Sequence, residues 1–398
     1  MVNDTNNTNN TTVTPIIDEY KFDIYSQNTL KGFVSAGSAH GENVPLLFKP
    51  LKIKDMELKN RIVVSPMCQY SSQDGFMNDW HLAHLSSFAR GGAGLVIFEA
   101  TAVNPEGRIS YADSGLWKDD HIAPLKRINN LIHSLGSKSG IQIGHAGRKA
   151  SSTPVFLENG RAHLDKSHKD GWEVVGPSPV AFSANVPHEL TVDEIQKIVE
   201  DFRLAAIRAL KAGFDFLEIH GAHGYLVNNF LSPVSNKRTD AYGGDLQGRS
   251  RFLFEVIKAV RSVWPTEKPL GVRLSCIEWV SDGWSIEDTV ELSKIIKNMD
   301  IDLIDCSTGG NVASQKIEMG PLYQVPFAER VKKEIPDIIV GTVGLINTGT
   351  EAESILQSGK ADLVMLGRAF LRNPHWPYAA AKELNANIDF AIQYTFAK

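Results

Sequence analysis

Between residues 62 and 367 the sequence alternates short apolar runs with longer stretches of helical periodicity. Several apolar runs are continuous, as in IDLIDCS at 301–307 and ADLVMLG at 361–367. Continuous runs are typical of parallel strands buried on both faces, because helices cover both sides of such a sheet. The predicted strands are 62–65, 94–100, 140–145, 214–220, 270–275, 301–307, 338–344 and 361–367.

Helical patterns separate these runs. The clearest follows Thr191, which has Glu194 three residues later, the signature of a capping box. Gly136, Gly213 and Gly359 lie where helices must stop. The predicted helices include 120–135, 192–212, 247–263, 286–298, 327–334 and 348–357. Strands that each precede a helix predict an α/β fold, a single-domain (β/α)8 or TIM barrel. An open doubly wound sheet is the competing layout, but no G-x-G-x-x-G motif opens the first helix.

Three segments are expected to lie outside the barrel of residues 45–385. Residues 1–44, rich in Asn and Thr near the start, are predicted to form a disordered tail, because they hold little to bury. Residues 386–398 form a C-terminal tail. Residues 146–190, which follow the third strand, are too long for an ordinary connection and are interpreted as a lid. A surface excursion or an oligomer contact is the alternative for this segment.

Composition excludes several classes of protein. The formal net charge is −5, which gives no electrostatic reason to expect a nucleic acid or an anionic membrane as partner. No run reaches the roughly 20 apolar residues that a membrane-spanning helix needs. The three cysteines, Cys68, Cys276 and Cys306, are too few and too scattered for a disulfide framework or a metal–thiolate cluster. A reducing, cytoplasmic location is therefore expected.

Candidate functional residues cluster at one predicted rim. The active sites of (β/α)8 barrels lie at the C-terminal ends of the strands, where the following loops begin. Polar, aromatic and small residues concentrate at these positions, namely Ser65, Pro66, Met67, Cys68, Gln69, Tyr70, Glu99, Ala100, Gln142, His145, His220, His223, Tyr225, Arg273, Gly344, Gly367 and Arg368.

Two of these features allow two interpretations each. Gly344, Gly367 and Arg368 follow the last two strands, where barrels often bind phosphate, but such glycines also make tight turns and the arginine could pair with a carboxylate. Arg273 lies among apolar residues of the fifth strand, and a buried cation is costly without an anion. That anion is either a buried Asp or Glu or a ligand that becomes negative during the reaction.

The pair His220 and His223 allows three interpretations. The imidazoles could bind a metal with His145 or Asp305, form a satisfied structural pair, or donate hydrogen bonds to a carbonyl or nitro oxygen. In the last case Tyr225 is the proton source. His81 and His84 are interpreted instead as helix-packing or capping residues.

Several segments closely resemble the Old Yellow Enzyme family of FMN-dependent ene-reductases. They are KIKDMELKNRIVVSPMCQYSSQDG, EATAVNPEGRIS, QIGHAGRKA, EIHGAHGYLVNNFLSPVSNKRTDAYGG, LIDCSTGG and LVMLGRAFLRNP. The resemblance covers about residues 45–385. It is nearest the branch that has cysteine after Ser-Pro-Met and a His-x-x-His pair.

This resemblance implies an NAD(P)H dehydrogenase that binds FMN non-covalently and takes electrons from NADPH or NADH. It implies that His220 and His223 hold the substrate oxygen, that Tyr225 protonates the α-carbon and that Tyr70 helps to bind substrate. Hydride would pass from flavin N5 to the β-carbon in ping-pong turnover. The flavin would contact Ser65, Pro66, Met67, Cys68, Ala100, Gln142 and Arg273, with its phosphate at Gly344, Gly367 and Arg368.

The sequence departs from the family pattern in two places. The branch carries an arginine near its C-terminus that enters a neighbouring subunit's pocket, whereas this chain ends in IQYTFAK, with Phe396 near that position. The segment after the third strand also has extra residues around 155–172. A homodimer or homotetramer is the implied assembly. The alternative functions are a flavin-binding redox sensor that relies on Cys68 and a barrel isomerase or metal-dependent hydrolase.

Overall fold

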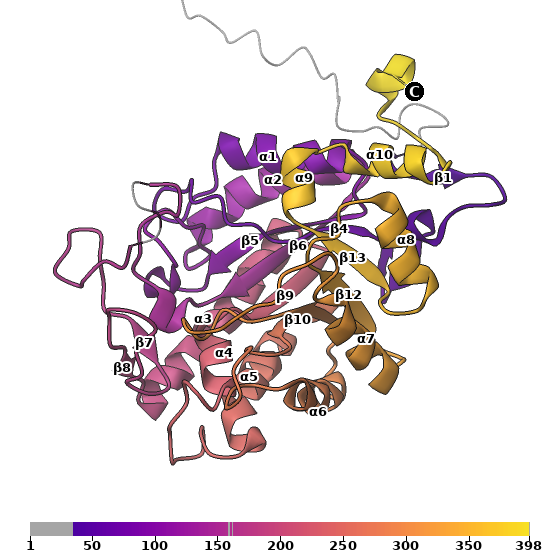
Figure 1. Ribbon diagram of the computed structural model, residues 1–398. Coiled ribbons are helices and arrows are strands. Elements are labelled where there is room, and N and C mark those ends of the chain that lie inside the picture. The colour runs from indigo at the N-terminus through magenta and orange to yellow at the C-terminus, as the bar shows by residue number, and fades with distance from the viewer. Residues whose placement is uncertain (1–34, 158–159, 161, 398) are drawn as a thin grey trace, which may run out of the picture.

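Parallel strands close into a barrel in the computed structural model, which describes residues 35–157, 160 and 162–397 (Figure 1). Around the barrel the strands follow one another in chain order, and β13 pairs with β4 to close it. The TIM-barrel prediction is confirmed, and the open-sheet alternative is wrong. The barrel strands are β4 (Ile62–Val64), β5 (Leu95–Ala102), β6 (Lys138–Gly144), β9 (Phe216–Gly221), β10 (Leu270–Ser275), β11 (Leu303–Ser307), β12 (Ile339–Val343) and β13 (Leu363–Leu366).

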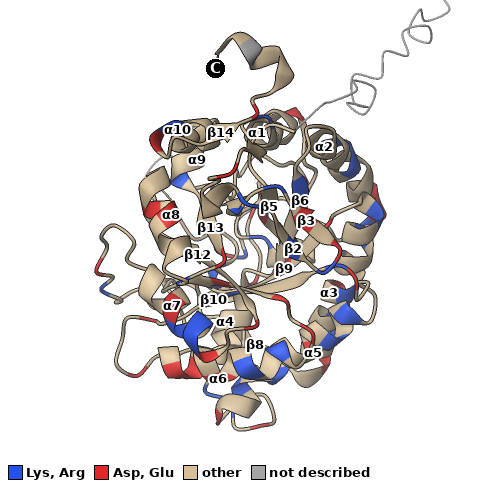
Figure 2. Cartoon of the chain, turned by 90° about the vertical axis from the view of Figure 1, so that its right-hand side faces the viewer, with Lys and Arg blue, Asp and Glu red and all other residues tan. Residues whose placement is uncertain are grey.

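Helices surround the strands, and their charged residues lie mainly on the outer surface of this ring (Figure 2). Helix α3 has the predicted bounds, because Thr191 forms the expected capping box with Glu194 and Gly213 ends the helix at a φ of 90°. The helices are α1 (Asp79–Arg90), α2 (Ile122–Ser134), α3 (Val192–Ala212), α4 (Leu226–Leu231), α5 (Leu246–Arg261), α6 (Ile286–Lys297), α7 (Val325–Glu334), α8 (Gly349–Gln357), α9 (Arg368–Arg372) and α10 (Trp376–Glu383).

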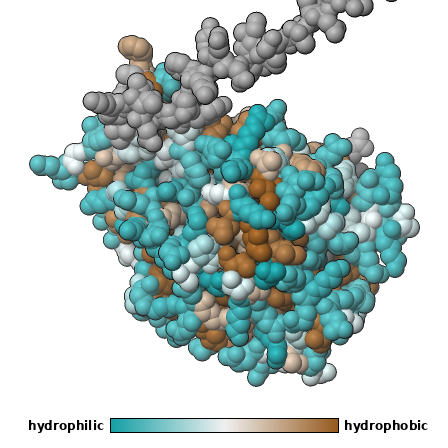
Figure 3. Space-filling model, turned by 180° about the vertical axis from the view of Figure 1, so that it is seen from behind, coloured by the Kyte–Doolittle hydropathy of each residue, from teal (hydrophilic) through white to brown (hydrophobic). Residues whose placement is uncertain are grey.

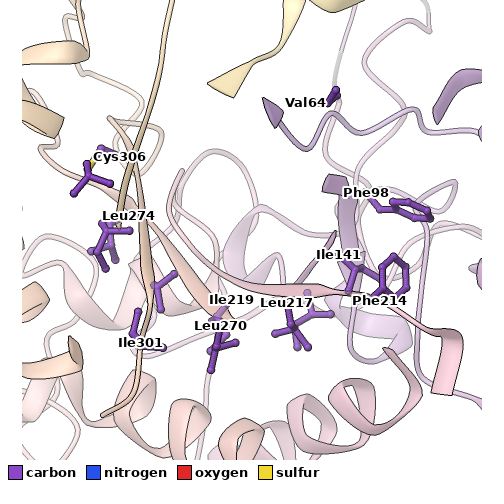
Figure 4. Packing of buried hydrophobic residues seen from close by; sticks show 14 of the residues in the cluster. Val64, Phe98, Ile141, Phe214, Leu217, Ile219, Leu270, Leu274, Ile301 and Cys306 are labelled. Atoms are coloured by element: carbon purple, nitrogen blue, oxygen red, sulfur yellow. The ribbon is translucent and has the colours of Figure 1, made fainter. Parts of the chain in front are cut away.

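Apolar side chains fill the space between strands and helices. Phe98 of β5 meets Phe214 edge to face at 4.8 Å, with Ile141 and Leu217 close by (Figure 4). The strand residues that alternate with these point to the other face and form a second buried cluster. This cluster includes side chains of the hairpin β2 (Leu51–Ile53) and β3 (Met56–Leu58). Because apolar side chains of the barrel strands fill this cluster, the polar residues at the C-terminal ends of the strands are free to form a site.

Two short strands near the ends of the described chain pair with each other. Strand β1 (Ala39–His40) runs antiparallel to β14 (Asn387–Ile388), so ordered structure begins before the expected boundary at Pro45. The predicted C-terminal tail likewise includes β14 and a 3-10 helix at Ile392–Ala397. The rest of the predicted N-terminal tail, residues 1–34, lies outside the described residues.

The 146–190 excursion packs against the rim of the barrel. It carries a 3-10 helix (Gly147–Lys149) and the short paired strands β7 (Val175–Gly176) and β8 (His188–Glu189). Its residue Phe156 approaches Tyr70 edge to face at a ring distance of 6.4 Å. The excursion therefore reaches a predicted substrate-binding residue.

The molecular surface is mostly hydrophilic. On the face seen from behind, apolar side chains gather in one central area with hydrophilic ones around it (Figure 3). Among the described residues, no helix combines the length and the apolar character needed to cross a membrane.

Candidate active site

A pocket of about 320 Å³ opens at the C-terminal ends of the strands. It brings together residues that are far apart in the sequence but were predicted to share this rim. Its lining consists of Ser65, Pro66, Met67, Cys68, Ala100, Gln142, His220, His223, Tyr225, Arg273, Val343, Gly367, Arg368 and Leu371. Of the residues that the family resemblance assigns to the flavin or the substrate, Tyr70 and Gly344 are the two that do not line it.

Gly344 lines an adjoining pocket of about 80 Å³ at the ends of β12 and β13, which shares Gly367 and Arg368 with the first. Its φ is 120°, and a Cβ atom there would lie 2.6 Å from Nε2 of Gln324. The left-handed conformation favours glycine, and a larger residue would also have to displace the Gln324 side chain. Tyr70 lies beside the main pocket, in a small apolar cluster that it shares with Cys68 and Tyr225.

A bulge in β5 sets the direction of two adjacent side chains. Phe98 pairs with Ile141 and Thr101 with Ile143, so that Glu99 and Ala100 both stand opposite Gln142 alone. An extra residue of this kind redirects side chains, and such bulges are frequent near active sites. Ala100 lines the pocket. Glu99 is buried and accepts hydrogen bonds from the backbone N–H of Gln69 and from the Ser114 hydroxyl.

Polar residues at matching register form a layer across the barrel interior. His220 of β9 stands opposite Arg273 of β10, which stands opposite Asp305 of β11. Two residues before His220 in β9, Glu218 stands opposite Gln142 of β6. The Gln142 amide donates a hydrogen bond of 2.7 Å to the Glu218 carboxylate. This layer places a cation, two carboxyl groups and an amide below the pocket.

The carboxylate interpretation of Arg273 is confirmed, and the ligand interpretation stays a prediction. Its Nε lies 2.9 Å from Oδ2 of the fully buried Asp305, so a carboxylate partner exists. The same arginine also lines the pocket and can face a ligand. Burial raises the pKa of Asp305, and burial together with the Asp305 charge raises the pKa of Glu218 to about 8.

The two imidazoles are neutral hydrogen-bonding groups. Burial, and then the charges of Arg273 and Lys149, hold the pKa of both His220 and His223 well below the usual range. Nδ1 of His220 accepts a bond of 3.2 Å from the Ala222 backbone N–H, which places the ring proton on Nε2. Nε2 of His223 lies 2.7 Å from the Ser307 hydroxyl. Their rings are 5.2 Å apart and perpendicular.

The backbone around His223 is unusual. The residue has a φ of 61°, and the Ser275 hydroxyl accepts a hydrogen bond of 2.8 Å from its N–H. Directly after it, Gly224 packs so tightly that a Cβ atom would lie 2.4 Å from the carbonyl oxygen of Gly310. The Tyr225 ring then stands edge to face against His220 at 4.8 Å. The turn thus gathers two imidazoles and a phenol at one wall of the pocket.

The other histidines have structural contacts. Nδ1 of His81 accepts a hydrogen bond from the Asn78 backbone N–H and caps α1, as predicted, while His84 packs edge to face on Phe88 at 4.7 Å. Nδ1 of the buried His145 accepts from the Gly147 N–H. Within residues 35–157, 160 and 162–397, no three His, Cys, Asp or Glu side chains gather into a group that could hold a metal ion.

The chain is similar to several known proteins. Residues 46–387 match the NADH:flavin oxidoreductase / NADH oxidase family. The chain is 47% identical over 353 residues to an NADPH dehydrogenase of Geobacillus sp. (strain WCH70). This alignment covers 88% of this chain and 97% of that relative. It is 45% identical over 352 residues to an NADPH dehydrogenase of Bacillus subtilis (strain 168), which covers 87% and 98%.

The chain belongs to this family. Among solved structures, morphinone reductase in complex with tetrahydroNAD is similar, with a TM-score of 0.71, 27% identity, and coverage of 87% of this chain and 92% of that one. A 2-naphthoyl-CoA reductase has a TM-score of 0.77 at 25% identity, with coverage of 85% and 52%. The resemblance to the Old Yellow Enzyme family is therefore confirmed. As a family member, the protein is an NAD(P)H dehydrogenase that uses FMN with NADPH or NADH.

The pocket suits the flavin of this family. Gln142 donates one amide N–H to Glu218, and its carbonyl oxygen stays available to accept a hydrogen bond from an N–H of the flavin ring. Arg273 offers a buried cation beside it. The adjoining pocket provides Gly344, Gly367 and Arg368 for a phosphate group. The ring N–H, the edge that becomes negative and the phosphate of FMN would thus each have a matching group in these two pockets.

Several residues of the site were not predicted from the sequence. Val343 and Leu371 line the pocket, Glu218 supports Gln142, and Ser307 contacts His223. Glu218 carried a usable signal, because an acidic residue inside the apolar run FDFLEIH is as unusual as Arg273 in its strand. The other three residues have no comparable mark.

Proposed function

We propose that the protein is an ene-reductase that reduces the C=C bond of α,β-unsaturated carbonyl or nitro compounds. The observation that carries this proposal is the wall formed by His220, His223 and Tyr225 above Ala100 and Gln142. Two neutral imidazoles beside a phenol form a hydrogen-bonding site for one oxygen atom with a proton donor next to it.

The imidazoles would bind and polarise the substrate oxygen. His220 presents its Nε2–H, because its Nδ1 already accepts the Ala222 N–H. His223 would offer its Nδ1–H when the Ser307 hydroxyl donates to Nε2. Hydrogen bonds from both rings favour electron density on that oxygen, so that the alkene β-carbon becomes electrophilic.

Tyr225 would deliver the proton that completes the reduction. Its ring lies 4.8 Å from that of His220, so a substrate oxygen held by the imidazoles would bring the alkene close to the phenol. FMN, when bound and reduced by NADPH or NADH, would supply the hydride. Tyr70, in the same apolar cluster as Tyr225, would contact the rest of the substrate.

The remaining predicted residues would hold the flavin. Ser65, Pro66, Met67 and Ala100 would line its ring system, and Gln142 would bond to the pyrimidine edge. Arg273 would stabilise negative charge at the N1/O2 side, and Cys68 would tune the ring's potential. Gly344, Gly367 and Arg368 would bind the phosphate. Nicotinamide and alkene would use the same pocket in turn, covered by residues of the 146–190 lid.

The test is a pair of half-reactions on purified protein loaded with FMN. We expect NADPH or NADH to bleach the flavin absorption, and cyclohexenone or a maleimide to restore it rapidly without oxygen. Bleaching without reoxidation by any alkene would contradict the proposal and favour the redox-sensor alternative. A protein that neither contains nor takes up FMN would contradict both.

A further inference from the structure

Two serines at neighbouring strand ends hold His223 at different points. Ser275 of β10 and Ser307 of β11 are register partners. The Ser275 hydroxyl contacts the His223 backbone, whereas the Ser307 hydroxyl lies 2.7 Å from Nε2 of the His223 ring. Ser307 is buried, so little water competes for this contact. Ser307 is therefore the residue that can act on the state of the ring itself.

The hydroxyl proton of Ser307 has two acceptors within reach. One is Nε2 of His223 at 2.7 Å, and the other is Oε1 of Gln324 at 3.4 Å. The Gln324 atom is an oxygen, because the amide nitrogen at the other position donates a bond of 2.8 Å to the carbonyl oxygen of Val343. Good O–H···O bonds have donor–acceptor distances of about 2.5–3.0 Å, so the contact with Gln324 is too long.

Oε1 of Gln324 also has a better donor than Ser307. The hydroxyl of Thr308 donates to it at 2.7 Å. Tyr323 also forms a hydrogen bond with Thr308, and its phenol carries a proton of its own to donate to the Thr308 oxygen. The arrangement with the best hydrogen bonds therefore has Thr308 donating to Gln324 and Ser307 donating to His223.

A hydrogen bond accepted at Nε2 decides where the imidazole proton lies. The ring is neutral, because burial and nearby positive charges hold the pKa of His223 well below its usual range. A neutral imidazole has one N–H and one acceptor nitrogen, so a ring that accepts at Nε2 carries its proton on Nδ1. His223 lines the pocket, and Nδ1 is the ring nitrogen that Ser307 does not contact.

We propose that Ser307 is a positioning residue that sets the tautomer of His223, so that the pocket selects ligands through an oxygen that accepts two hydrogen bonds. The inference rests on the proposed function of the same pocket and deepens it. His220 presents its Nε2–H, because its Nδ1 accepts from the Ala222 N–H. With both rings donating, carbonyl, nitro and phenolate oxygens fit. The opposite tautomer of His223 would pair one donor with one acceptor and would favour amides or alcohols.

NMR observes the tautomer directly and needs no turnover. We would label the histidines of the FMN-loaded protein with nitrogen-15 and distinguish protonated from unprotonated ring nitrogens by their chemical shifts. Among the 12 histidines, the signals of His223 are those that a His223→Asn variant lacks. We expect the wild-type protein to carry this proton on Nδ1. In Ser307→Ala the proton should move in part to Nε2, which a neutral histidine side chain prefers when neither nitrogen has a partner.

Ligand binding gives a second readout. A bound phenolate accepts hydrogen bonds but does not react, so we would titrate the FMN-loaded protein with 4-chlorophenol and follow the flavin spectrum. For Ser307→Ala we expect phenolate affinity to fall about tenfold, the effect of weakening one hydrogen bond to a charged oxygen. Ser307→Thr keeps the hydroxyl and should restore both the tautomer and the affinity.

Ser275→Ala is the matched control. It removes a strand-end hydroxyl that contacts the backbone of the same histidine, so it tests whether any disturbance of the His223 turn changes the ring. We expect the proton to stay on Nδ1 in this variant.

The possible outcomes are distinct. A wild-type His223 that carries its proton on Nε2 would overturn the inference, whether or not the variants fold. Equal tautomer changes in Ser307→Ala and Ser275→Ala, or a Ser307→Thr that behaves like Ser307→Ala, would also overturn it. Failure of the wild-type protein to bind FMN or to be reoxidised by an alkene would instead count against the proposed function.

Discussion

Replacing Arg273 by methionine tests how much the ion pair of Arg273 and Asp305 stabilises the folded protein. The arginine Nε lies 2.9 Å from Oδ2 of Asp305, and Asp305 has no exposed surface. Two opposite charges about 4 Å apart interact by about 4 kcal/mol at an effective dielectric constant of about 20. Removing one partner of a buried pair costs about 3–5 kcal/mol, because the other charge stays buried. We expect Arg273→Met to lower the free energy of unfolding by this amount near pH 8.

The loss should depend on pH with a definite sign. Burial already raises the pKa of Asp305, and without the arginine charge that pKa rises further. Between the unfolded value of about 4 and this raised value, the folded state binds more protons, so stability falls as pH rises. The Arg273→Met deficit should therefore be largest at pH 8 and shrink toward pH 5. Urea denaturation at both pH values measures it.

A double variant provides the control. Arg273→Met with Asp305→Asn removes both charges, so much of the lost stability at pH 8 should return. In FMN-loaded protein, the single variant should also lower the two-electron midpoint potential by about 30–60 mV, since about 30 mV corresponds to 1.4 kcal/mol. An equal deficit at pH 5 and pH 8, with no recovery in the double variant, would refute this account of the pair.

Three other substitutions test single residues. Tyr225→Phe should slow reoxidation by an alkene at least tenfold while flavin reduction stays near the wild-type rate, as measured by stopped flow; equal slowing of both steps would remove Tyr225 as proton donor. Cys68→Ser should shift the FMN midpoint potential, and an unchanged potential would leave the thiol a packing role only. Glu99→Gln should reduce the loss of stability that the wild-type protein shows as pH rises from about 4.5 to 8, because burial raises the pKa of Glu99 from 4.5 to about 8 and Glu218 and Asp305 account for the rest; urea midpoints with the full wild-type dependence would contradict it.

Most of the barrel could be predicted from the sequence, because hydrophobic runs and capping residues act locally. The bounds of α3 follow from Thr191, Glu194 and Gly213, which are all close in sequence. The β1–β14 pair was not predicted, since each strand has two residues and its partner lies more than 300 residues away. Short helices such as α4 and α9 also lack a periodic signal of their own.

The candidate site divides in a similar way. Residues at strand ends, such as Gln142 and Arg273, were predicted because barrel geometry places all such positions on one rim. Ser307 was not, because its contact with His223 joins the loop after β9 to the end of β11 at positions that no spacing in the sequence reveals. The bulge at Glu99 and Ala100 is equally hidden, since a register shift depends on the partner strand.

The pairing of β1 with β14 has a practical consequence for protein engineering. Backbone hydrogen bonds join Gly37 to Asp389 and Asp389 to Ser38, so the two ends of the described fold are already neighbours. A circular permutant that links these segments through a few residues, and opens instead within the exposed turn at residues 166–169, would keep every barrel strand beside its present neighbours.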